Sequence, residues 1–178
     1  NTAMGYQSLT SNTTGANNTA LGRASLYTNT TTSNNTALGF QALYTNAANN
    51  NSALGHNALF NNTTGASNTA VGKGALENNT TASDNTAMGL SALAATTTGA
   101  NNVAVGYNSL TANTTGTRNV AIGAQALEAN TTTSDNTAIG YMALEENLAS
   151  NNTAVGKDAL TSNTTGSENV AVGLDCLQ

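Results

Sequence analysis

The chain has 178 residues, of which only 7% are charged and 4% aromatic, and its formal net charge is −5 at pH 7. Its four basic side chains form no basic patch, which argues against nucleic-acid binding, and no apolar run approaches the roughly 18 residues of a membrane span. Asn, Thr, Ala and Gly dominate and Pro is absent, a composition untypical both of folded enzymes and of charge-rich disordered chains.

Residues 1–17 contain a pattern that the rest of the chain repeats. The pattern reads Asn, Thr or Val, Ala, an aliphatic residue, Gly, two variable residues, a small residue and Leu. The Gly recurs every 17 residues, with a step of 16 from Gly39 to Gly55 and from Gly140 to Gly156. A strict period this short predicts a stacked architecture, so we expect residues 1–178 to form one continuous repeat array, a piece of a longer fibrous protein.

Each repeat predicts two short strands and two turns. Thr or Val, Ala and the aliphatic residue at positions 2–4 suit one strand, and the small residue and Leu at positions 8–9 suggest a second. Asn, Thr, Ser and Gly at positions 10–17 disfavour a helix. We therefore predict an all-β fold, a parallel β-solenoid (β-roll) of about eleven 17-residue coils, which would form a rod roughly 50 Å long.

Both faces of the first strand carry restricted side chains. Positions 2 and 4 share one face and are mostly sizeable and apolar, whereas positions 3 and 5 are always Ala and Gly. This pattern favours a strand covered twice, once by its own coil and once by another chain, and so predicts a homotrimer or filament. Alternatively, the position-5 Gly serves only a bend with positive φ.

The Leu at position 9 is the expected structural core. It occurs in every copy: Leu9, Leu26, Leu43, Leu59, Leu76, Leu93, Leu110, Leu127, Leu144, Leu160 and Leu177. The Asn at position 1 is also invariant, and we expect its amide to pair with the Asn above and below, or to support a left-handed turn.

Charged and bulky residues occupy the variable positions. All charges fall at positions 6, 7, 10, 11 and 17, which therefore mark the solvated edges. Aromatic residues at positions 6 and 10 are candidate surface contacts for a partner, although they could equally shield strand edges: Tyr6, Tyr27, Phe40, Tyr44, Phe60, Tyr107 and Tyr141.

Two further hypotheses arise from the Asn-Thr-Thr segment. Six copies satisfy the N-glycosylation sequon, which would suit a glycosylated extracellular filament: Asn12, Asn29, Asn79, Asn113, Asn130 and Asn163. Stacked Thr pairs such as Thr13-Thr14 would form the columns of an ice-binding (antifreeze) β-solenoid. However, adjacent residues face opposite sides of a strand, and the copies at 46–50 and 147–151 lack the pair.

The sequence offers little material for catalysis. His56 is the single histidine and lies at a variable position, and Cys176 takes the place of a small core residue. No acid–base pair recurs and acidic residues are too sparse for repeated calcium loops, so we predict no enzyme activity, no cofactor and no metal site.

The strand motif resembles a known family of surface proteins. Residues 102–106, 119–126 and 136–141 resemble the head repeats of trimeric autotransporter adhesins (YadA-like) and the Asn-Thr-Ala-x-Gly-Tyr-x-Ala-Leu repeats of phage and bacterial tail-fibre-like proteins. The resemblance covers the whole chain, and the repeats here are longer than those of the adhesin head.

This resemblance implies a left-handed trimeric β-roll outside the cell or on a virion. We expect a structural or adhesive fibre segment that acts as a stiff multivalent spacer, or as a rod that contacts a receptor. Its partners would be further copies of itself and a host-surface glycan or protein.

Overall fold

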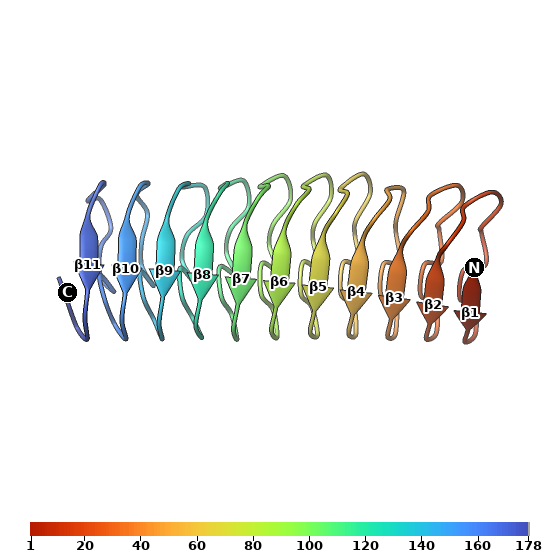
Figure 1. Ribbon diagram of the computed structural model, residues 1–178, viewed down its shortest axis with the longest axis horizontal. Helices are drawn as coiled ribbons and strands as arrows, with labels where there is room; N and C mark the ends of the chain where they lie inside the picture. Colours follow the sequence, from red (N-terminus) through yellow and green to blue (C-terminus); the bar gives the residue numbers. More distant parts are fainter. Residues whose placement is uncertain (178) are drawn as a thin grey trace.

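The computed structural model describes residues 1–177, which form a parallel β-solenoid. One sheet contains eleven three-residue strands in chain order (Figure 1): β1 (Thr2–Met4), β2 (Thr19–Leu21), β3 (Thr36–Leu38), β4 (Ser52–Leu54), β5 (Thr69–Val71), β6 (Thr86–Met88), β7 (Val103–Val105), β8 (Val120–Ile122), β9 (Thr137–Ile139), β10 (Thr153–Val155) and β11 (Val170–Val172). The predicted all-β solenoid, with one coil for each sequence repeat, is therefore confirmed.

Each coil contributes one strand, so the predicted second strand at positions 8–9 is wrong. The residues around it form a turn in which positions 7 and 9 both have positive φ, for example 52° at Asn108 and 52° at Leu110. A left-handed conformation costs an L-residue about 1–2 kcal/mol. Full burial of a leucine side chain contributes about 1.5–3 kcal/mol, which offsets that strain.

Glycine at position 5 ends each strand and permits close stacking of coils. Gly106 has a φ of 139°, and a Cβ on it would lie 2.5 Å from the carbonyl oxygen of Gly123 in the next coil. This agrees with the alternative drawn from the sequence, in which the position-5 Gly serves a bend with positive φ. The same glycine allows the backbones of neighbouring coils to touch at this corner.

Neighbouring strands pair in equal register, including across the two shorter coils. Thr36 pairs with Ser52, and Ala37 with Ala53, across the first of these shorter steps. The missing residue lies in the loop after position 12: the Asn46 amide donates to the carbonyl two residues on, whereas the Asn62 amide donates to the carbonyl three residues on. The strand register is therefore independent of this deletion.

The interior is a narrow seam of Ala, Leu and Asn. Ala at position 3 and Leu at position 9 are fully buried in the central coils, as Ala104 and Leu110 illustrate. The position-1 Asn lies beside them, and its amide mainly closes the coil. One bond of the expected amide ladder forms at this position, from Asn102 Nδ2 to Asn85 Oδ1 at 3.2 Å. Asn68 Oδ1 accepts the backbone N–H of Asn85, and Asn68 Nδ2 donates to the carbonyl of Ala82.

The amide ladder runs instead through position 12. Asn62 donates to Asn46 at 2.8 Å, and Asn79 donates to Asn62 at 2.7 Å. Thr96 interrupts the column, because its hydroxyl donates to a backbone carbonyl and leaves Asn79 Oδ1 without a partner among residues 1–177. Buried amides must be paired, so these ladders bind each coil to the next.

No helix long and apolar enough to cross a membrane is found in residues 1–177.

Candidate functional surfaces

The outward face of the sheet carries a continuous column of Thr or Val beside a column of aliphatic side chains. Position 3 points inward, so positions 2 and 4 point outward along all eleven strands. We call these position-2 and position-4 residues the outer strip. No charged residue occurs in the outer strip, and Leu54 and Ile122 remain 49% and 39% exposed. The sizeable apolar face of the strand is thus the one that the chain itself leaves uncovered.

A shallow apolar depression of about 170 Å³ lies within the outer strip. Leu38, Leu54 and Val71 line it on the aliphatic side, and Thr36 and Ser52 line it on the other. Ser52 is the single serine at position 2, and it lacks the methyl group that threonine carries at this position in neighbouring strands.

The aromatic candidates form two stacked columns at the coil corners. In the position-10 column, the ring of Tyr44 lies 5.1 Å from Tyr27 on one side and 5.1 Å from Phe60 on the other. In the position-6 column, Phe40 stacks on His56 at 5.0 Å, and the Arg23 guanidinium lies 5.5 Å from the Phe40 ring.

The stacking decides which ring surfaces remain free. Both faces of Tyr44 are covered by its neighbours, so a ligand could reach only its edge. The remaining candidates at position 6 are more accessible: Tyr6, Tyr107 and Tyr141 are 68%, 52% and 45% exposed. Contact by a partner stays a prediction for all seven residues.

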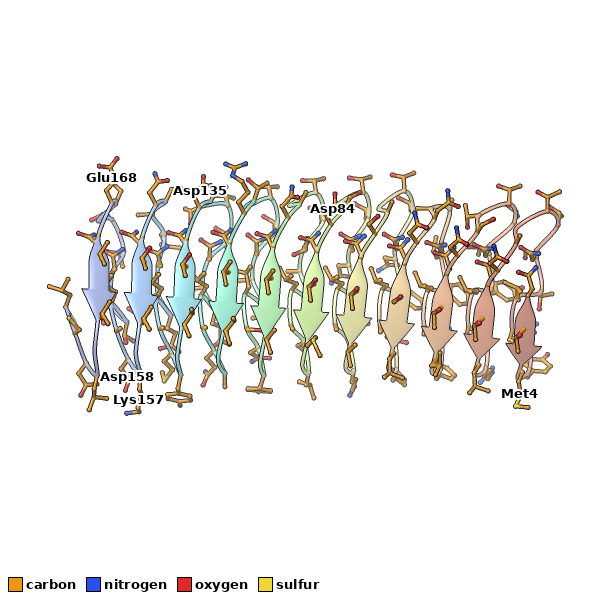
Figure 2. All side chains as sticks on the ribbon, viewed as in Figure 1. Met4, Asp84, Asp135, Lys157, Asp158 and Glu168 are labelled. Atoms are coloured by element: carbon orange, nitrogen blue, oxygen red, sulfur yellow. The ribbon has the colours of Figure 1, made fainter. Side chains whose placement is uncertain are left out.

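Charged side chains lie along the two margins of the sheet (Figure 2). Asp84, Asp135 and Glu168 extend from one margin, and Lys157 and Asp158 from the opposite one. The guanidinium of Arg118 binds Asp135 in the next coil at 2.6 Å and holds the pKa of that carboxyl below its usual range. This exposed pair contributes little to stability.

A local concentration of negative charge surrounds Glu145. Burial raises the pKa of its carboxyl, and Glu128, Glu146 and Asp158 raise it further by repulsion. Within residues 1–177 no three His, Cys, Asp or Glu side chains form a group suited to a metal ion.

The Thr pairs of the ice-binding hypothesis lie in a bend, not in a strand. The first hydroxyl of each pair is often used within the solenoid: Thr80 Oγ1 donates to the carbonyl of Thr97 at 3.0 Å, and Thr114 Oγ1 donates to that of Thr131 at 3.0 Å. A regular column of Thr lies instead in the outer strip, where Thr occupies position 2 in most coils.

The sequon asparagines belong to the position-12 ladder. Asn29, Asn79, Asn113 and Asn130 are fully buried, and only Asn12 and Asn163 at the two ends are partly accessible. An amide in the ladder points into the closed coil, where the folded solenoid has no space for a glycan. The pattern Asn-Thr-Thr that produces the sequon therefore serves the fold in these four copies.

The position-9 leucines occupy the seam along the rod. They are fully buried from Leu26 to Leu144, whereas Leu9 is partly buried and Leu177 is 59% exposed in the terminal coils. Cys176 packs against the seam and is half-buried. His56 is exposed and lies in the position-6 column.

Sequence reasoning missed two features of the surface. One is that the aliphatic face of the strand points outward, because alternation alone does not say which face is inside. The other is a cavity beside Gly74, whose only signal was that Gly replaces a side chain at position 7 in this one coil.

Comparison with known proteins gave no match: no family model, no curated protein and no solved structure is significantly similar to this chain. The resemblance to adhesin and tail-fibre repeats stays a prediction.

Proposed function

We propose that the chain is a structural and adhesive fibre segment, displayed on a cell surface or virion, in which several copies pack through their outer strips. The observation that carries the proposal is the uncharged, largely aliphatic strip that runs along all eleven strands and that the chain does not cover itself. Strip side chains that face water in an isolated chain would form a dry seam between chains.

The geometry of the strip favours further copies of the same chain as its occupants. Its side chains recur once per coil at the strand spacing of about 4.8 Å. A second solenoid with the same period can match it at every coil, whereas a partner with another period would match it only at isolated points. The depression beside Ser52 would accept an apolar side chain from a neighbouring copy.

The strip alone is smaller than a standard interface, so assembly would also have to bury its flanks. Eleven strands at about 4.8 Å, each about 10 Å long, give a face of roughly 500 Å². This equals the largest apolar patches of monomeric proteins and lies below the roughly 800 Å² per partner of a standard interface. Three chains around one axis, as the resemblance implies, would let each chain use both flanks of the strip against two neighbours.

In this proposal the fibre is a stiff spacer with repeated contacts along its corners. The rod carries the same corner positions in every coil, so weak contacts of position-6 and position-10 side chains with a host-surface glycan or protein would add up by avidity. Nothing in this role requires catalysis, a cofactor or a metal.

Molar mass measured by light scattering tests the proposal. A trimer would have three times the 17.8 kDa mass of the single chain. The double variant Val105→Lys and Ile122→Lys puts charge into the strip without entering the seam. It should yield a 17.8 kDa species with an unchanged β-type circular dichroism spectrum.

Leu90→Lys is the matched control, because position 6 carries Lys in two other coils, at Lys73 and Lys157. This variant should have the same molar mass in solution as the assembled parent protein. A parent chain that is strictly monomeric at all concentrations would contradict assembly through the strip.

Ice binding is a second candidate, now favoured by the Thr column of the outer strip rather than by the Thr pairs. Seven of the eleven strip residues at position 2 are Thr, and the aliphatic column beside them is uncharged. Ice binding requires a free strip and assembly requires a covered one, so the two functions exclude each other on this surface. A monomer with thermal hysteresis that Thr69→Lys abolishes would favour ice binding and displace the fibre proposal.

A further inference from the structure

The solenoid carries a cavity of about 110 Å³, bordered by polar and apolar atoms alike, at a coil corner away from the outer strip. Its lining includes Asn57, Lys73, Gly74, Glu77, Leu90 and Ser91. These residues come from positions 6, 7 and 10 of three successive coils. The cavity exists because Gly74 has no side chain, where each of the other ten coils has one at position 7.

The lining of the cavity contains hydrogen-bond acceptors as well as donors. Asn57 Nδ2 donates to Glu77 Oε1 at 3.1 Å. Asn57 Oδ1 is buried and has no hydrogen-bond partner within residues 1–177. A Cβ on Gly74 would lie 3.2 Å from Glu77 Oε2 and 3.8 Å from Ser91 Oγ, so both oxygens border the empty space.

A second copy of the same arrangement identifies the group that belongs there. Three coils further along, Asn108 donates to Glu128 Oε1 at 3.2 Å, as Asn57 does to Glu77. Gln125 occupies the position of Gly74 in that copy, and its amide donates to Glu128 Oε2 at 2.8 Å. Oε2 of the position-10 glutamate thus receives an amide N–H in the second copy, at Glu128, and borders a cavity in the first copy, at Glu77.

The rest of the lining restricts the ligand further. Lys73 and Glu77 carry opposite charges, which favours a neutral ligand, and the ring of His56 completes the lining. The Lys73 ammonium and the Ser91 hydroxyl are donors for a carbonyl oxygen, and the half-exposed Leu90 offers an apolar contact. A volume of about 110 Å³ holds several waters and is enough for one acetamido group.

We propose that this cavity binds the acetamido group of an N-acetylated sugar. The amide N–H would donate to Glu77 Oε2, the carbonyl would accept from Lys73 or Ser91, and the methyl group would contact Leu90. The sugar ring would lie outside, along the corner. The site deepens the adhesive role proposed above, but it lies in a single chain and does not depend on assembly through the outer strip.

Chemical-shift mapping of the ¹⁵N-labelled chain tests the site with a matched pair of probes. Methyl N-acetylglucosaminide should shift the backbone amide of Gly74 and the side-chain amide of Asn57. Methyl glucoside, which has a hydroxyl in place of the acetamido group, should shift neither. No shift with the first probe, or equal shifts with both, would overturn the proposal.

Gly74→Gln is the variant designed to fill the cavity. The other position-7 residues adopt φ values of 51–60°, close to the 67° of Gly74, and three of them are Gln, so the substitution suits the backbone. It should recreate the network of Gln125 and weaken binding about tenfold or more. Undiminished binding by this variant would place the ligand elsewhere.

Glu77→Ala provides an independent check that leaves the cavity open. Ala94 occupies the same repeat position in the next coil, so alanine fits the fold there. This variant should also lose about tenfold or more in affinity, because a carboxylate acceptor is removed. A glutamine-containing peptide that shifts the same two amides more strongly than the N-acetylated sugar would assign the site to a peptide and refute the proposed ligand. Light scattering on these variants reports on assembly separately.

Discussion

Truncation of Leu110 to alanine isolates the contribution of the leucine seam. Leu110 is fully buried, its φ is 52°, and its backbone N–H donates to the carbonyl of Ala126 in the next coil at 2.9 Å. Alanine is also an L-residue with a Cβ, so the left-handed strain stays the same and the backbone bond can persist. The change in the free energy of unfolding is therefore a packing effect, expected at about 2–5 kcal/mol.

Leu177→Ala is the matched control, because Leu177 has the same repeat position and a φ of 54° but is 59% exposed. We expect it to change the free energy of unfolding by no more than about 0.5 kcal/mol. Urea unfolding followed by circular dichroism gives the overall loss, and hydrogen exchange shows whether coils beside residue 110 open first, as a nearest-neighbour array predicts. A loss below about 1 kcal/mol for Leu110→Ala would refute the assignment of the seam as the stabilising core.

Four further substitutions test other parts of the fold. Gly106→Ala places a Cβ 2.5 Å from the carbonyl oxygen of Gly123 and should lower the free energy of unfolding, measured in urea, by at least about 2 kcal/mol. Gly74→Ala should lower it clearly less, because the nearest neighbour of the new Cβ is a flexible carboxylate. Asn62→Ala removes both ladder bonds of Asn62, to Asn46 and from Asn79, and should lower the free energy of unfolding by about 1–3 kcal/mol. A neutral result would mean that water replaces the amide. Burial and neighbouring carboxylates raise the pKa of Glu145, so its charged form destabilises the folded state. That carboxyl contributes most to stability below its unfolded pKa, and its contribution falls as pH rises through the raised folded pKa. The Glu145→Gln variant should thus raise the urea midpoint at neutral pH and leave it unchanged at about pH 3, where the carboxyl is protonated in both states.

The repeat made the strand and its register predictable. Because Thr or Val, Ala and an aliphatic residue recur at a constant interval, only equal-register stacking places like residues on like residues. The strands do pair in this way, Ala87 with Ala104 and Ala104 with Ala121. The turn at positions 6–9 was not predictable in the same way. Leucine rarely adopts positive φ, so Leu110 indicated a strand where the structure has a left-handed turn.

The candidate surfaces were predictable in part. Charge at the variable positions indicated the solvated corners, but the stacking that covers both faces of Tyr44 depends on neighbours in the two adjacent coils. The sequons illustrate the opposite error. The sequence suggests that Asn79 is an accessible glycosylation site, but its side chain lies in a fully buried amide ladder.

The sequence alone determined the period, the strand and the stacking of like residues on like residues, because a pattern repeated at constant intervals imposes the same local conformation in every coil. Only the tertiary structure decided which side of each strand lies inside. Leu110 from the turn fills the interior of so short a coil and leaves room on the strand side only for the methyl group of Ala104, so Val103 and Val105 face outward. The same closure decided that the missing side chain at Gly74 leaves a cavity beside Asn57 and Glu77, since these residues meet only when their coils stack.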